Sequence, residues 1–328
     1  MEIIVKDFKT KEFKKCRYIS HHVKELVFAD TEQEEDVQTF EAHIPQQKDY
    51  QYKCTFFKKY KEPTVPQKTH FVSLHTEEDN FKRCGEFISK KASEYFDTVS
   101  IYTPTLLTEL GFTKHLKVYE PTPMLGIYAS YVAVAASRVD IMLHELSKMN
   151  DGDLLFYRDI NYEKYPKYKN FENIIEVALE CLDKCGSDFF VPFCDQYNEC
   201  KYTKRLVFQT KTNIIRELGE DQLFSYNFPQ IQACIFIMRK SHETIDILTE
   251  WKNTTDNEEW MDGKQYGDMH PLFCGQTLLD NSLLSMVIAN RIRKNKLPEH
   301  YPGLYFYDRD IHKLREYTDY SHLEFKNM

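Results

Sequence analysis

Glycine is scarce in this sequence, with 10 glycines among 328 residues, whereas the average share in proteins is about 7%. Neither G-x-G-x-x-G nor G-x-x-x-x-G-K-[ST] occurs, which excludes the two common glycine-rich loops that bind nucleotide phosphates. If this chain binds such phosphates, side chains or a metal ion must hold them.

Long hydrophobic runs and an excess of basic residues are also missing. No stretch approaches the roughly 18 consecutive apolar residues of a membrane span, and the N-terminus has no apolar signal-peptide segment. The formal net charge of −8 at pH 7 disfavours a nucleic-acid partner, because basic residues bind such partners largely through their phosphates. We therefore expect a soluble, cytoplasmic protein with no membrane span and no bound nucleic acid.

The nine cysteines are odd in number and mostly isolated. Cys181 and Cys185 are close in sequence, but no second close pair with histidine completes a zinc site. Free thiols in a reducing compartment are the simplest interpretation of this pattern.

The first part of the chain differs from the rest. Short β-patterned runs at 2–5, 24–28 and 51–57 are separated by charged turns, and the prolines of segment 61–66 interrupt regular pairing. These patterns predict a small β-rich N-terminal element over residues 1–66 and a second domain over residues 67–328.

The second part alternates between strand and helix patterns, and its strands are nearly continuous apolar runs. This alternation indicates an α/β domain with a parallel or mixed sheet that is covered on both faces. The predicted strands are 70–74, 98–102, 153–157, 189–193, 231–238 and 304–307, and the predicted helices are 80–96, 139–149, 171–182, 243–251 and 278–292. The polar segment 253–267, which contains Trp260, is predicted to be a mobile loop.

The most informative stretch runs from Asn150 to Asn161, with the sequence NDGDLLFYRDIN. It predicts a turn, a hydrophobic strand and, after the strand, Asp159 and Asn161. Ligands collect at the carboxyl ends of strands in open α/β sheets, and two oxygen ligands suit Mg²⁺ or Mn²⁺. Such a cation would neutralise a diphosphate. The alternative is a strand-end turn in which these side chains cap the backbone.

The run from Val139 to Asn161 combines a helix, N-D-G-D, an apolar strand and Y-x-D-x-N. It resembles a run in GT-A-fold glycosyltransferases from polysaccharide-building loci, whose pattern is a W-K-P helix followed by N-D-G-D-x-x-x-Y-x-D. Here Ser137-Arg138-Val139 stands in place of W-K-P, which keeps the positive charge. Three later stretches resemble elements of that group in the same order: Tyr202-Thr203-Lys204-Arg205; Gln232-Ala233 with the next strand and Trp251; and Leu279-Asp280-Asn281-Ser282-Leu283-Leu284-Ser285.

The resemblance implies a three-layer GT-A-like fold with a mixed, mostly parallel sheet. It also implies a hexosyl- or pentosyltransferase that uses Mn²⁺ or Mg²⁺ and moves a sugar from a nucleotide sugar, by analogy a UDP-sugar, to a glycan or glycoprotein acceptor. The implied metal ligands are Asp159, Asn161 and His312, the implied nucleotide contacts are His75, Thr76, Tyr102, Arg138, Lys204 and Arg205, and the implied acceptor-side base is Asp280.

Other interpretations remain open at this point. An aspartate that begins a helix, as Asp280 does, is very often an N-cap. A metal-dependent nucleotidyltransferase would use the same acidic strand end, and it would release pyrophosphate from a nucleoside triphosphate. A non-catalytic relative that binds a sugar or a partner would have kept the fold alone, and the changed Ser137-Arg138-Val139 element is compatible with it.

Overall fold

The computed structural model describes five strands between residues 2 and 56, and most of the chain from residue 66 onward. Contacts divide the chain into two compact units, Met1–Val65 and Pro66–Met328. In the second unit the described residues are 66–116, 136–160, 171, 173–193, 206, 210, 212–231, 233–261, 279–298 and 301, with the strands 305–308 and 313–316.

The first unit holds a five-stranded mixed sheet with the order β1-β2-β3-β5-β4. β3 and β5 are parallel, and the other pairs are antiparallel. The sequence predicts β1, β3 and β5 but not β2 and β4, in which charged side chains interrupt the apolar pattern. The strands are β1 (Glu2–Lys6), β2 (Phe13–His22), β3 (Glu25–Ala29), β4 (Thr39–His43) and β5 (Gln51–Phe56).

The second unit is an α/β fold built on another five-stranded mixed sheet, with the order β7-β6-β8-β10-β9. β7, β6 and β8 are parallel, whereas β10 is antiparallel to both of its neighbours. The predicted mixed sheet is therefore confirmed, although two of its four described pairings are antiparallel. The strands are β6 (Thr69–Leu74), β7 (Thr98–Tyr102), β8 (Leu154–Asp159), β9 (Phe189–Phe190) and β10 (Ile235–Arg239).

Three predicted strands differ clearly from the structure in extent or place. The predicted strand 231–238 corresponds to β10, which begins four residues later. β9 covers two residues of the predicted 189–193, because Pro192 lacks the N–H that a ladder requires. The predicted strand 304–307 corresponds to β11 (Tyr305–Asp308), which pairs with β12 (Lys313–Glu316) in a separate two-stranded sheet. The last predicted strand is therefore confirmed to within one residue, but it does not belong to the main sheet.

Each predicted helix corresponds to a long helix of the structure, with ends that differ by one to four residues, and several short helices were not predicted. Ser241 caps α9 by accepting a hydrogen bond from the N–H of Thr244. The predicted loop 253–267 is helical in its first half, where α9 ends and α10 follows. The helices are α1 (Asp79–Ala92), α2 (Pro104–Glu109), η1 (Lys114–Leu116), α4 (Arg138–Lys148), α5 (Ile174–Cys185), α7 (Thr212–Leu218), α8 (Gln222–Asn227), α9 (His242–Thr255), α10 (Glu258–Met261) and α11 (Leu279–Arg293).

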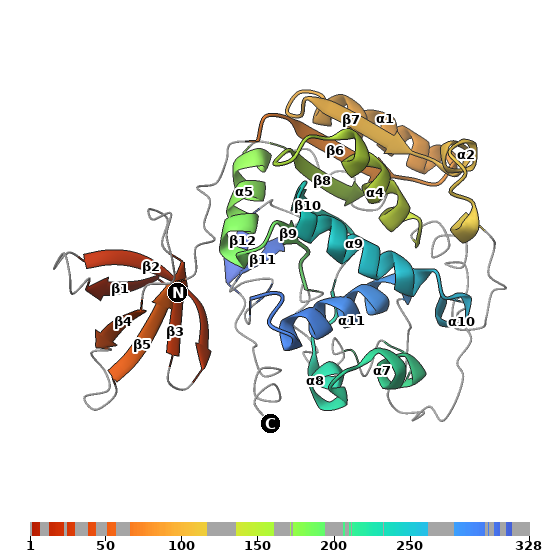
Figure 1. Cartoon of the computed structure of the whole chain (residues 1–328). Coiled ribbons are helices and arrows are strands. Elements are labelled where there is room, and N and C mark those ends of the chain that lie inside the picture. Colours follow the sequence, from red (N-terminus) through yellow and green to blue (C-terminus); the bar gives the residue numbers. More distant parts are fainter. Residues whose placement is uncertain are drawn as a thin grey trace. The chain divides into compact units, whose positions relative to one another are not determined.

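Aromatic rings cover both faces of the main sheet. On one face the ring of Phe71 lies 5.4 Å from that of Phe96, just beyond α1, and 5.8 Å from that of Phe171, before α5. On the other face Phe236 of β10 stacks at 5.4 Å on Trp251 of α9. The sheet is therefore the middle of three layers, and Figure 1 shows α9 running beside α11 on the Trp251 side.

Asp153 fixes the turn that leads into β8. Its carboxylate is 1% exposed, and it accepts hydrogen bonds from the N–H groups of Lys68, at 3.0 Å, and Asn150, at 2.9 Å. One aspartate thus joins the residue before β6 to the turn before β8. Gly152 in this turn has φ of +88°, a conformation that favours glycine.

We expect Asp153→Ala to lower the free energy of unfolding by about 1 to 3 kcal/mol, because two backbone N–H groups would lose their acceptor. Asp151→Ala is the matched control, since the Asp151 side chain is 90% exposed and exposed sites usually change stability by less than about 0.5 kcal/mol. Urea unfolding of both variants measures the difference, and equal losses would contradict this role of Asp153.

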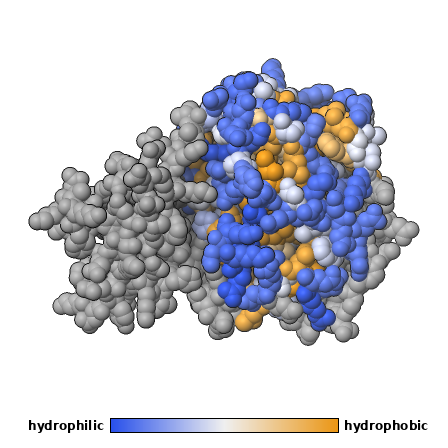
Figure 2. Space-filling model, in the orientation of Figure 1, coloured by the Kyte–Doolittle hydropathy of each residue, from blue (hydrophilic) through white to orange (hydrophobic). Residues whose placement is uncertain are grey.

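Hydrophilic residues dominate the described surface on the face in Figure 2, with hydrophobic residues in smaller groups between them. Among the residues whose exposure is described, the exposed large hydrophobic side chains are Tyr95, Leu110, Leu223 and Ile245. They lie on or next to different helices, as is normal for a protein surface. Within the part of the chain that is described, no helix is long and apolar enough to cross a membrane.

Candidate functional site

Three parallel strands end at the same edge of the main sheet. Leu74, the last residue of β6, pairs with Tyr102 of β7 on one side and with Asp159 of β8 on the other. β8 runs two residues beyond its predicted end, so Asp159 is the last residue of the strand. Its N–H donates to the carbonyl of Cys234 at 2.9 Å, and this backbone hydrogen bond holds the Cα of Asp159 in place at the edge of the sheet.

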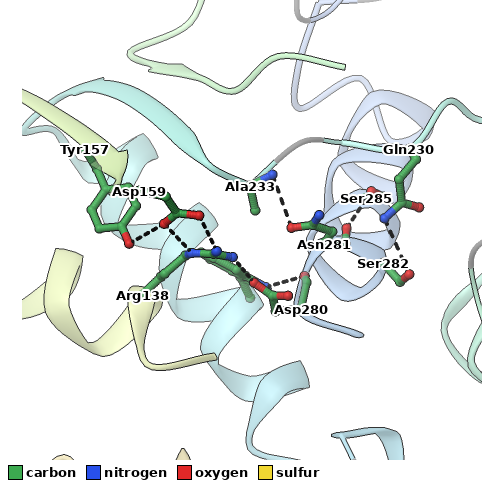
Figure 3. A network of polar contacts seen from close by, with 10 residues as sticks. Arg138, Tyr157, Asp159, Gln230, Ala233, Asp280, Asn281, Ser282 and Ser285 are labelled. Atoms are coloured by element: carbon green, nitrogen blue, oxygen red, sulfur yellow. Dashed lines mark hydrogen bonds and ion pairs between the residues drawn. The ribbon is translucent and has the colours of Figure 1, made fainter. Parts of the chain in front are cut away.

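A buried arginine joins the two aspartates that the sequence singles out. Arg138 begins α4, and its Nε donates to Oδ1 of Asp159 at 3.0 Å while Nη2 donates to Oδ2 of the same carboxylate. Its Nη1 donates to Oδ2 of Asp280, near the start of α11. Figure 3 shows the guanidinium between the two carboxylates. Residues 138, 159 and 280 therefore form one ion-pair network.

Little of this network reaches the surface: Arg138 is 4%, Asp159 9% and Asp280 6% exposed. The bidentate contact with Asp159 is the strong geometry for an arginine and a carboxylate. Ion pairs that are this buried depend on one another, because removal of one partner leaves an uncompensated charge out of water.

Two aromatic residues fix the positions of the aspartates. The hydroxyl of Tyr157 donates to Oδ1 of Asp159 at 2.8 Å, from the same face of β8. The indole N–H of Trp251 donates to the backbone carbonyl of Asp280 at 3.1 Å, and this ring is fully buried against Phe236. Trp251 is therefore a core residue that also holds the backbone of Asp280 in place.

Polar side chains of α11 bind the segment that precedes β10. Asn281 accepts a hydrogen bond from the N–H of Ala233 at 3.2 Å, and Ser285 accepts one from the N–H of Ile231 at 2.8 Å. Gln230 donates from its side chain to Ser282 at 3.4 Å. Figure 3 shows these contacts beside Asp280. Ile231 and Ala233 lie before β10, and their N–H groups bond to side chains of α11 instead of a neighbouring strand.

The surroundings of the network change two pKa values. Burial raises the pKa of the Asp280 carboxyl, Asp159 adds to this rise, and Arg138 opposes it. Burial, with a contribution from Asp159, raises the pKa of the Cys234 thiol to about 12. A thiol with this pKa stays protonated near neutrality and is a poor nucleophile. The chemistry of the site therefore belongs to its carboxylates and guanidinium.

His75 and Thr76 follow β6 at this edge of the sheet. The N–H of His75 donates to the carbonyl of Tyr102 at 3.1 Å, and its Nδ1 lies 2.6 Å from the carbonyl oxygen of Thr76. The imidazole is 9% exposed and lies against Gly85 of α1, where a Cβ atom would be 2.6 Å from both Cδ2 and Nε2. The imidazole of His75 is thus packed directly against the backbone of α1 at Gly85.

Tyr102, the last residue of β7, is buried against α4. Its hydroxyl donates to Glu145, its ring lies 6.4 Å from that of His144, and 2% of the residue is exposed. Burial raises the pKa of this hydroxyl well above its usual value, and the bond to Glu145 adds to the effect. These contacts favour a packing role over the predicted contact with a nucleotide base.

The other predicted site residues, Asn161, Lys204, Arg205 and His312, lie outside the described residues. Sequence reasoning missed Tyr157 as a partner of Asp159. A signal was present, because residues two apart on a strand share a face. It also missed the link from Trp251 to Asp280, for which the sequence carries no local signal.

The described donor set suits a divalent cation. Asp159 and Asp280 contact the same guanidinium and their charges interact. Mg²⁺ is usually held by one or two carboxylates together with substrate phosphates and water, so these two aspartates fit such an ion. Among the described residues there is no group of three or more His, Cys, Asp or Glu side chains that could hold a metal.

Comparisons of this chain with models of protein families, with curated proteins and with solved structures found no match. The α/β fold with its five-stranded mixed sheet is established, and function has to be inferred from the residues at the carboxyl edge of that sheet.

Proposed function

We propose that this protein is a glycosyltransferase that transfers a sugar from a nucleotide-sugar donor, with a divalent cation on the diphosphate. One observation supports the proposal above all. Arg138, Asp159 and Asp280, which the resemblance to GT-A enzymes implies as site residues, come from distant parts of the chain and meet in one network. The network lies where parallel strands end, the usual place for a ligand in an α/β sheet.

Arg138 is the residue best suited to the donor diphosphate. A guanidinium binds phosphate oxygens in a bidentate manner, and it keeps its charge at any physiological pH. Asp159 and Asp280 are the described residues that would hold Mg²⁺ or Mn²⁺, and a bound cation neutralises charge on the leaving diphosphate.

If Asp159 alone holds the cation during transfer, Asp280 is the described carboxylate best suited to be the general base of an inverting reaction. The acceptor oxygen bonds to the anomeric carbon, the bond from that carbon to the diphosphate oxygen breaks, and its electron pair leaves with the diphosphate. Asp280 accepts the proton of the acceptor hydroxyl. Its raised pKa suits this role, because a general base works best when its pKa lies closer to the working pH.

A thermal-shift panel of nucleoside diphosphates and nucleotide sugars, with and without Mn²⁺, tests this proposal. We expect one nucleotide to raise the Tm of the wild-type protein, because a ligand at 100 times its Kd stabilises the folded state by about 2.7 kcal/mol. UDP and UDP-sugars are the first expectation. Asp159→Asn keeps the size of the side chain but removes its charge, so the shift that depends on Mn²⁺ should be lost.

Asp151→Asn is the control, because it removes an exposed carboxylate near the start of the same strand. It should keep the full response. Release of the nucleoside diphosphate on addition of glycan acceptors then measures transfer. Failure of every nucleotide and nucleotide sugar to raise the Tm of folded wild-type protein would contradict the proposal. Pyrophosphate release from a nucleoside triphosphate would indicate a nucleotidyltransferase instead.

A further inference from the structure

We propose that Arg138 is a tethered cation that competes with a divalent metal ion for the carboxylates of Asp159 and Asp280. This inference deepens the proposed function, because it concerns the cation expected at that site. It assigns two alternating partners to the same carboxylates, the guanidinium of this chain and a free cation.

The hydrogen bonds to Asp159 leave little room for a second partner. Oδ1 accepts from Nε of Arg138 at 3.0 Å and from the hydroxyl of Tyr157 at 2.8 Å, which accounts for both of its lone pairs. Oδ2 accepts from Nη2 of Arg138. A cation that binds Asp159 through Oδ1 must therefore displace a donor, and Arg138 contributes to both oxygens.

Charge acts in the same direction as geometry. When all three side chains are ionised, the two carboxylates and one guanidinium carry a net charge of −1, which still attracts a cation. A divalent ion placed on the carboxylates would also lie close to the positive guanidinium. In a site that is more than nine-tenths buried, this repulsion is weakly screened. The ion should therefore bind more tightly when the guanidinium is absent or has moved away.

Displacement of Arg138 would have a useful consequence for the donor. In the described state three of its N–H groups bond to carboxylates. When a metal ion takes over the carboxylates, these N–H groups become available to the diphosphate oxygens. Binding of the ion and binding of the diphosphate would then favour each other by the same factor.

The test is a titration of the full-length protein with Mn²⁺ alone, in which electron paramagnetic resonance measures the free ion. Only the site that is lost in Asp159→Asn is counted, which separates it from weak surface binding. We expect Arg138→Met to lower the Kd of this site for Mn²⁺ by about tenfold or more, because a nearby unit charge is removed. Methionine is chosen because, unlike glutamine, it has no carbonyl oxygen that could bind the ion.

Arg291→Met is the matched control. Arg291, in α11, is a buried arginine like Arg138, and it pairs with Glu250 at 2.9 Å. It lies 11 residues beyond Asp280 in the same helix, so its loss should leave the Kd for Mn²⁺ unchanged. Arg138→Lys is the second variant if the methionine variant does not fold, as circular dichroism would show. A lysine keeps the charge but has no bidentate fork with which to hold both oxygens of Asp159, so we expect a smaller decrease in Kd than in Arg138→Met.

An unchanged Kd for Mn²⁺ in both Arg138 variants would overturn the competition, as would the absence of any site that depends on Asp159. Neither result depends on nucleotide binding, which the thermal-shift panel measures without Mn²⁺ as well as with it. A Kd that falls in Arg138→Met although no nucleotide binds would support the competition while contradicting the proposed glycosyltransferase. The two proposals can therefore fail separately.

Discussion

Arg138→Met is expected to lower the free energy of unfolding by about 3 to 5 kcal/mol, because breaking a buried ion pair leaves charge without compensation. The loss here should be near the upper end of that range. Two carboxylates that are 9% and 6% exposed would face each other without the guanidinium between them. Urea unfolding at neutral pH measures the change.

The loss should become smaller as the pH falls. Burial already raises the pKa of Asp280, and Arg138 is the group that opposes this rise, so its removal raises the pKa of the folded state further. The folded variant then binds more protons than the unfolded chain, in which the pKa of an aspartate is about 3.9. Its stability relative to wild type therefore increases as the pH is lowered from neutrality toward that value.

Two comparisons make this prediction specific. A second substitution, Asp280→Asn, should recover part of the stability of Arg138→Met, because it removes one of the two facing carboxylates. Arg291→Met should cost less, since Glu250 is 43% exposed at its side chain and stays in contact with water. A loss in Arg138→Met that does not change with pH would show that its cause is packing and not charge.

Gly85→Ala should destabilise the protein by about 1 to 3 kcal/mol, the range for overpacking in a well-packed core. In an ordinary helix the same change would be stabilising by about 0.5 to 1 kcal/mol, because alanine loses less backbone freedom. Here a Cβ at position 85 would lie 2.6 Å from two atoms of the His75 ring, closer than atoms pack.

His75→Ala provides the control for this steric explanation. Without the imidazole the added methyl group has space, so Gly85→Ala in the His75→Ala background should become stabilising by about 0.5 to 1 kcal/mol. The four proteins of this double-mutant cycle can be compared by denaturant unfolding. A loss of equal size in both backgrounds would mean that His75 is not what Gly85 makes room for.

Local patterns predicted the elements of the second unit well where they were long and apolar. β7 has the predicted bounds, and α4 and α11 differ from their predicted ranges by one residue at each end. The parallel order of β7, β6 and β8 also follows from strand and helix alternation. Periodicity works here because each element buries one face or both against the same core.

The remaining features depend on contacts between distant residues, which local patterns do not contain. The reversed direction of β10 and the short β9 are set by pairing. Asp159 and Asp280 were both singled out in the sequence, but nothing there indicated that one arginine binds them both. Tyr102 was misleading for the same reason, because its position at a strand end does not reveal its hydroxyl partner, Glu145.

The bond from Arg138 to Asp280 joins residues that are 142 positions apart, and this separation has a consequence for folding. Closing so long a segment costs chain entropy before the contact forms, and contacts of this kind slow folding. β6, β7 and β8 can pair before α11 has left the ribosome, whereas the charge network cannot. Ligand binding that depends on Asp280 therefore requires α11 to be present and packed. A fragment that ends before α11 should not bind the ligand in this way, even if its sheet has formed.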